Sequence, residues 1–195
     1  GRNFAVDHWG VKPDMIVCAK GLASGYSPIY CLLTTEEIRQ VILDGNGAFV
    51  HGHTYSQNPL SCAIAQAVLA YIEDHDLVRR SRELGAMLLR ELESLRELEG
   101  VGDVRGLGLF AGVEFVRDKA TKTPFDPRLK LNARVGARCL ENGLIVYPGG
   151  GGADGVHGDH VLLAPPFVIN EDQIRDLVGI LKASISQVMQ EPNLG

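Results

Sequence analysis

The feature that most constrains the fold is a short apolar run, Met15 to Ala19, which ends abruptly at Lys20. Pro13 and Asp14 precede the run, and the small residues 21–25 follow the lysine at once. A short, continuous apolar run between turn residues is typical of a strand buried on both faces of a sheet. The sequence therefore predicts a buried strand that places a lysine at its end, where the backbone becomes permissive.

Residues 29–72 continue with a second strand and an apolar helix. The strand is expected over 29–33. Asn58 followed by Pro59 is a strong helix start, because it joins an N-cap residue to a proline at the first helical position. The stretch 60–72 is apolar nearly all round, as for a helix inside a large core.

The pattern changes near residue 73, where we expect a domain boundary. Residues 77–98 form an amphipathic helix, with leucines on one face and charged residues on the other. Beyond it, glycine-interrupted strand patterns and further helices make a compact α+β unit of ordinary domain size. The sequence thus predicts two domains, 1–72 and 73–195.

Composition excludes several classes of function. The net charge of the 195 residues is −5 and the lysines and arginines are scattered, which argues against a nucleic-acid-binding protein. No apolar run is long enough for a membrane span, and no signal peptide is visible, so we expect a cytoplasmic protein. The cysteines show no CxxC spacing and stand in apolar patterns, so we expect buried thiols in a reducing compartment. They are Cys18, Cys31, Cys62 and Cys139.

Position alone leaves two roles open for Lys20. A lysine at the end of a buried strand can keep its ammonium in water while its stem covers apolar surface, and position alone favours this role. The alternative is a nucleophile, because desolvation or a nearby cation lowers the pKa of the amine. The glycine-rich segment after Lys20 speaks for a function, since it lets the backbone approach a ligand closely.

A second informative stretch covers residues 50–62, VHGHTYSQNPLSC. It places the hydroxyls of Thr54, Tyr55 and Ser56 just ahead of the helix that begins at Pro59. The free N–H groups of a helix N-terminus suit an anion such as phosphate. Helix capping is the simpler explanation for this stretch taken alone.

Four stretches, in this order along the chain, together resemble one known family. They are PDMIVCAKGLASGYSPI, HGHTYSQNPLSCAIA, VRGLGLFAGVEF and GDHVLLAPPFVI. The chain is similar to the class III aminotransferases, which are pyridoxal-phosphate enzymes of fold type I. The resemblance implies an α/β fold: the end of a large cofactor-binding domain, with a mostly parallel sheet and helices, followed by a smaller α+β C-terminal domain.

The resemblance also implies roles for individual residues. Lys20 would form a Schiff base with pyridoxal 5′-phosphate and then move a proton between the substrate carbon and the cofactor. Thr54 matches the threonine that binds the cofactor phosphate of the neighbouring subunit, so the active site would be shared across a homodimer. We expect Tyr55, in the same motif, to contact the cofactor as well.

The implied reaction is transamination, in which an amino group moves from an amine or amino acid to a keto acid. Two alternatives stay open: another pyridoxal-phosphate reaction of the family, such as aminomutation, decarboxylation or racemisation, and a non-catalytic fragment or pseudoenzyme. No nucleic acid or membrane is expected among the partners.

Two departures from the family concern recognition of a substrate carboxylate. Leu162 stands where members that act on ornithine-like α-carboxylates carry an arginine, and Tyr147 stands where several ω-amine transaminases carry a mobile one. Arg105 matches an arginine of the family motif that either contacts the substrate or braces the small domain, and we favour the bracing role. Arg105 and Tyr147 are kept as the candidate substrate residues.

Two further expectations concern groups that the site would lack. The loop after Tyr147 carries His157, Asp159 and His160, but it matches the family's active-site loop, so we expect no metal. The family's pyridine-binding aspartate, ring-stacking aromatic and phosphate-binding glycine-rich turn all precede the lysine, in a part that this sequence lacks. We therefore expect the sequence to be the C-terminal portion of a longer chain.

Overall fold

The structure, a computed structural model, describes residues 1–192, and its chain forms two compact units. The N-terminal unit comprises Arg2–Val78. The C-terminal unit begins at Arg79 and also includes Gly1. Each unit is described by itself.

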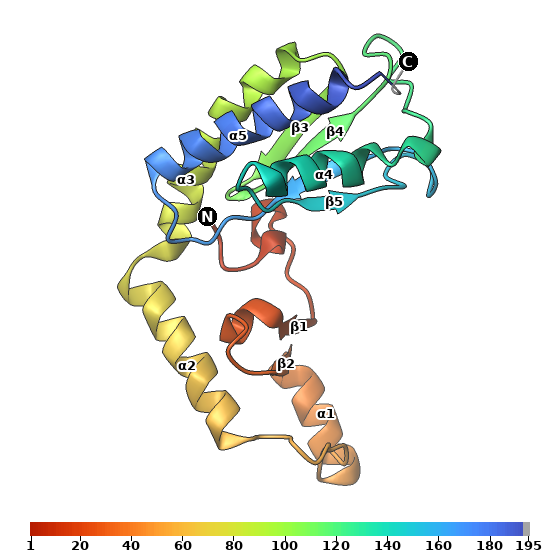
Figure 1. The fold of residues 1–195 in the computed structure, drawn as a ribbon. Helices are drawn as coiled ribbons and strands as arrows, with labels where there is room; N and C mark the ends of the chain where they lie inside the picture. The colour runs from red at the N-terminus through yellow and green to blue at the C-terminus, as the bar shows by residue number, and fades with distance from the viewer. Residues whose placement is uncertain (193–195) are drawn as a thin grey trace. The chain divides into compact units, whose positions relative to one another are not determined.

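The N-terminal unit is built around one antiparallel pair of strands (Figure 1). Strand β1 (Met15–Ala19) pairs with β2 (Tyr30–Thr34), and Ala19 lies opposite Tyr30 at one end of the pair. The other elements are the 3₁₀ turns η1 (Ala5–Trp9) and η2 (Lys20–Ala23) and the helices α1 (Glu36–Asn46) and α2 (Pro59–Asp74).

Polar side chains fix where the two helices of this unit begin. Thr35 is the N-cap of α1 and accepts a hydrogen bond from the backbone N–H of Ile38. Asn58 caps α2 by accepting from the N–H of Ser61 at 3.1 Å, and Pro59 occupies the first turn, as the sequence predicted. Each cap satisfies a backbone donor that the helix itself leaves without a partner.

The prediction of a mostly parallel sheet is wrong for the residues described. β1 and β2 are antiparallel, and all the pairings in the second sheet are antiparallel too. The physical reason is the connection between β1 and β2, residues 20–29, which holds only a 3₁₀ turn. Parallel neighbours need a longer crossover, usually with a helix, whereas an antiparallel pair needs only a short return.

The predicted burial of the first strand and of α2 is also wrong. Val17 is 70% exposed on β1 and Leu60 is 69% exposed on α2, while Ala65 is the buried residue of that helix. Two short strands and two helices present too few faces to one another to enclose a core. The cysteines follow the same trend, because Cys139 is buried whereas Cys62 is exposed and the other two are half-buried.

The C-terminal unit packs helices against a four-stranded antiparallel sheet of strand order β3-β4-β6-β5 (Figure 1). The α3 helix leads from the end of the N-terminal unit into this one. In chain order the elements are α3 (Leu77–Leu92), η3 (Glu93–Glu97), β3 (Val101–Leu107), β4 (Phe110–Phe115), η4 (Pro127–Leu129), α4 (Leu131–Glu141), β5 (Tyr147–Gly149), β6 (His160–Leu163) and α5 (Glu171–Met189).

One face of this sheet forms the hydrophobic core with α3, α4 and α5. Val104, Val113 and Val161 are successive cross-strand neighbours and are all buried. The apolar stripe of α5 lies in the same core, and α5 begins after the N-cap Asn170. The strands alternate between buried and exposed residues, so their other face remains open.

Within residues 1–192, no helix combines the length and the apolar character needed to cross a bilayer.

Two leucines of α4 test this division into core and surface. Leu131 is fully buried in the core, whereas Leu140 on the same helix is 64% exposed. Leu131→Ala should lower the free energy of unfolding by about 2–5 kcal/mol, because it removes buried methyl groups and leaves a cavity. Leu140→Ala should change it by no more than about 0.5 kcal/mol. Equal losses in denaturant unfolding would contradict this core.

Candidate functional site

Lys20 begins the 3₁₀ turn directly after β1, in an unusual backbone conformation. Its φ is +51°, in the left-handed region that residues with a side chain rarely adopt. The preceding residue, Ala19, is fully extended, so the chain turns sharply at the lysine. Lys20 is one of six non-glycine residues with a positive φ in residues 1–192, and it is the one that the sequence singled out.

The lysine side chain is exposed and has room around it. Among residues 1–192, its ammonium makes no hydrogen bond or ion pair. A Cβ added to Gly21 or Gly25 would meet no heavy atom within 4 Å, so both glycines border open space. The amine is therefore free to react with or bind a group placed beside η2.

Local contacts bring the Thr54 segment to the same end of the strand pair. Tyr30, which lies opposite Ala19, has its ring 6.5 Å from the ring of His53 in an edge-on arrangement. His53 directly precedes Thr54 in the chain. The lysine and the threonine motif, far apart in sequence, thus belong to neighbouring parts of one unit.

In the turn 53–58, some polar side chains cap backbone groups and others remain available to a ligand. Ser56 accepts a hydrogen bond from the N–H of His53 at 3.0 Å, and Asn58 caps α2, so the capping explanation holds for these two side chains. Thr54 and Tyr55 are exposed, and within the described chain neither side chain makes a hydrogen bond. Their hydroxyls remain available to a ligand in front of the α2 N-terminus.

The other candidate residues lie in the C-terminal unit, in one row across its sheet. Arg105 on β3 is opposite Gly112 on β4, which is opposite Leu162 on β6, which is opposite Tyr147 on β5. Directly opposed residues project from the same face of a sheet. The two candidate substrate residues therefore share the open face, and Tyr147 is 71% exposed there.

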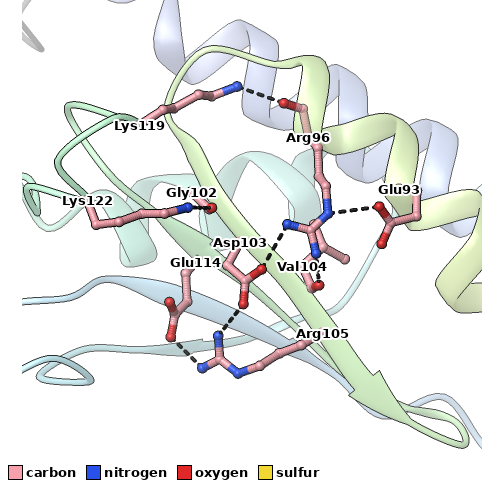
Figure 2. A network of polar contacts seen from close by, with 9 residues as sticks. All are labelled: Glu93, Arg96, Gly102, Asp103, Val104, Arg105, Glu114, Lys119 and Lys122. Carbon is pink, nitrogen blue, oxygen red and sulfur yellow. Dashed lines mark hydrogen bonds and ion pairs between the residues drawn. The ribbon is translucent and has the colours of Figure 1, made fainter.

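Two carboxylates already hold Arg105 (Figure 2). Its guanidinium donates to Asp103 at 2.8 Å and to Glu114 on the neighbouring strand. The hydrogen bonds that Arg105 donates to Glu114 and then to Asp103 raise the pKa of Arg105 above its ordinary value. A substrate carboxylate would have to compete with both of these partners.

Asp103 is the centre of a larger network that the sequence did not reveal. Its second carboxylate oxygen accepts from Arg96 of η3 at 2.8 Å, and Arg96 also donates to Glu93 and to the Val104 carbonyl (Figure 2). Burial favours the neutral form of Asp103, but the hydrogen bonds from Arg105 and Arg96 outweigh it and hold the pKa below its usual value. The network ties β3 and β4 to the turn that follows α3.

The loop between β5 and β6 uses its polar residues locally. Asp159 accepts from the backbone N–H of Leu131 at 2.8 Å, and so caps the start of α4, whose own N-cap residue supplies no side-chain acceptor. His157 contacts Asp154 at 2.8 Å, and His160 lies 3.4 Å from the Gly158 carbonyl. In residues 1–192, no three His, Cys, Asp or Glu side chains gather in a way that suits a metal ion.

Comparison with known proteins identifies the class of protein that this fold and this lysine define. The profile of the aminotransferase class-III family matches residues 1–185, so the chain belongs to that family. The uncharacterized aminotransferase YodT of Bacillus subtilis is 38% identical over the whole chain, which covers 44% of YodT.

Solved structures agree in fold and in sequence. A transaminase from the marine bacterium Virgibacillus matches 96% of this chain with a TM-score of 0.90 and 34% identity, and the match covers 42% of that protein. A PLP-bound amine transaminase from an uncultivated Pseudomonas species matches 93% of it with a TM-score of 0.84 and 34% identity, covering 40% of that protein. The chain thus spans about two fifths of the length of these relatives.

The residues present fit the cofactor that such relatives bind. Lys20 offers an exposed primary amine beside open space, which suits condensation with an aldehyde. Thr54 and Tyr55 offer hydroxyls without partners in the described chain, just ahead of a helix N-terminus, which suits a phosphate.

The network around Asp103 makes stability depend on pH. Asp103→Asn should lower the free energy of unfolding by about 1 kcal/mol at pH 7, as for an ion pair near the surface. Because the pKa of Asp103 is depressed in the folded protein, this contribution is present above the unfolded value, near 3.9, and is lost as the pH falls through the folded value. Denaturant unfolding of both proteins from pH 7 to pH 2 measures it. A difference that grows toward acid would contradict the assignment.

Proposed function

We propose that this chain carries the lysine-bearing part of a pyridoxal-phosphate-dependent aminotransferase, which moves an amino group from an amine or amino acid to a keto acid. The observation that carries the proposal is Lys20, a strained residue at the end of β1 with an available amine, in a chain of the class III family. When bound, pyridoxal phosphate supplies an aldehyde that takes up amines and a pyridine ring that withdraws electrons from the substrate carbon.

Lys20 has two tasks in this proposal. Its Nζ would hold the cofactor, at a residue where the backbone turns in a left-handed conformation. The neutral Nζ would also be the group that accepts a proton from the substrate carbon and later returns it. A side chain at Gly21 or Gly25 would meet no neighbouring atom, so the segment after Lys20 is open to a ligand.

Thr54 and Tyr55 bind the cofactor phosphate in this proposal, and the site is shared between two subunits of a homodimer. Hydrogen bonds to a charged phosphate are among the stronger ones in proteins. Support comes from the two exposed hydroxyls, which lack partners in the described chain while their neighbours cap the helix. The Tyr30–His53 contact brings this turn near the lysine of the same chain. An experiment must therefore decide whether Thr54 binds the cofactor of its own subunit or that of the partner subunit.

We assign Arg105 a bracing role and Tyr147 a contact with substrate. Two carboxylates bind Arg105 and neutralise its charge. Arg105 is therefore a poor anchor for an acidic substrate. Tyr147 and Leu162, its cross-strand neighbour, offer an apolar and hydroxyl-bearing surface on the same open face.

A keto-acid dependence test separates transamination from other reactions of the same cofactor. The full-length protein should convert pyruvate to alanine in the presence of an amine donor, and Lys20→Ala should abolish this turnover with the fold intact. Lys12→Ala, an exposed lysine ahead of β1, serves as the control and should retain activity. Turnover of the amine without any need for a keto acid would favour the aminomutase, decarboxylase or racemase alternative, and no turnover at all would favour a non-catalytic protein.

The phosphate assignment predicts weaker cofactor binding in Thr54→Ala. Loss of one hydrogen bond to a charged group costs about 1.5–3 kcal/mol, which corresponds to about a 10- to 150-fold rise in the dissociation constant. Ser56→Ala is the matched control, because its hydroxyl is already used within the turn. Equal affinities in Thr54→Ala and the parent protein would remove Thr54 from the site.

Mixed dimers of the two variants test whether the site is shared. In a dimer of one Lys20→Ala chain and one Thr54→Ala chain, a shared site joins the intact lysine of one subunit to the intact threonine of the other. The lysine-bearing site should then bind pyridoxal phosphate with the parent affinity. If each chain builds its own site, that affinity should stay as low as in Thr54→Ala alone.

A further inference from the structure

The pairing of β1 with β2 places two thiols directly opposite each other. Cys18 is the register partner of Cys31. The N–H of Thr35 donates to the carbonyl of Asp14 at 3.2 Å. Hydrogen-bonded pairs recur at every second position of an antiparallel ladder, so Cys18 and Cys31 form such a pair, with Cα atoms about 5.5 Å apart. That separation lies within the range that a disulfide requires.

The two thiols also share a face and an environment. Directly opposed residues project from the same side of the strand pair, and both cysteines are half-buried. The pKa of the Cys18 thiol lies above its ordinary value because of burial, the charge of Cys31 and a hydrogen bond with the Cys31 side chain. The strand register thus makes the two cysteines direct neighbours on one face of the strand pair.

The remaining cysteines stand in different settings. Cys62 is exposed on α2, and Cys139 is buried in the core of the C-terminal unit. Cys18 and Cys31 are the two cysteines that strand pairing brings together.

We propose that Cys18 and Cys31 are a redox-responsive modification site, which a low-molecular-weight disulfide oxidises to a reversible cross-strand disulfide. In proteins of reducing compartments, disulfides are usually transient and serve catalysis or redox sensing. A bond between half-buried positions is open to reduction, as labile and regulatory disulfides are.

The chemistry is a balanced thiol–disulfide exchange. The thiolate of one cysteine attacks one sulfur of the oxidant, which forms a mixed disulfide and releases one thiol. The second cysteine then loses its proton and displaces the other half of the oxidant, which closes the bond between Cys18 and Cys31. The protein has lost two hydrogen atoms, and the oxidant has been reduced to two thiols. A dithiol reverses both steps.

The bond would act on the lysine two residues further along the chain, and this consequence rests on the proposed function. Opposed Cβ atoms of paired strands lie about 4.5–5.5 Å apart, whereas a disulfide brings them to about 3.5–4.5 Å. Closing the bond therefore draws β1 toward β2 just before the turn at Lys20. A shift of the order of an ångström in a reacting group reduces turnover by up to about 100-fold.

Peptide mapping of the full-length protein tests the bond itself. The protein is incubated with glutathione disulfide, its free thiols are alkylated, and it is digested without reduction. We expect a linked peptide that contains Cys18 and Cys31 and that disappears after treatment with dithiothreitol. Cys62→Ser should give the same linked peptide. Cys31→Ser should not, and Cys31→Ala provides a second variant if the serine disturbs folding.

The outcomes separate this proposal from the proposed reaction. Alkylation of both Cys18 and Cys31 after oxidant treatment, or a link from either one to Cys62 instead, would overturn the modification site. A linked peptide with unchanged keto-acid-dependent turnover would contradict the effect on Lys20. Absence of turnover in the reduced protein would count against the aminotransferase proposal alone, because the peptide map does not depend on it.

Discussion

The antiparallel pairing of β1 with β2 is the constraint on which the candidate site depends. The ladder ends where Ala19 meets Tyr30, and the backbone changes there from fully extended to left-handed at Lys20. The lysine that follows this change is exposed. The same end of the pair carries the ring contact to His53, which brings the hydroxyl-bearing turn toward the lysine. A slip of one residue in this register would send every side chain of β1 to the opposite face.

The two units contribute different things to the molecule. The N-terminal unit carries Lys20 and the hydroxyls of Thr54 and Tyr55 but buries few of its own residues, whereas the C-terminal unit contains a continuous hydrophobic core. That core fixes one face of a four-stranded sheet, so the residues of the open face hold definite positions. The ion-pair network commits the exposed Arg105 to Asp103 and Glu114, and Tyr147 is exposed in the same row.

Local signals in the sequence predicted much of this structure. The apolar run before Lys20 and the Asn58–Pro59 helix start each correspond to an element found in the structure. Strand direction and burial were not predictable in the same way, because an apolar pattern says that a surface is suited to burial but not what covers it. The Asp103 network was not predicted either, because only the register of β3 and β4 shows that Asp103 and Glu114 are neighbours. Residue types at the site were visible in the sequence, whereas their partners depend on contacts between distant segments.

Reduction of the full-length protein with sodium borohydride, in the presence of pyridoxal phosphate, tests the central claim most directly. The reagent fixes the cofactor permanently to the amine that holds it, and peptide mapping then identifies that residue. The account predicts a single labelled lysine, Lys20, with loss of the label in Lys20→Ala. A label on any other lysine, or none at all on the full-length protein, would contradict it.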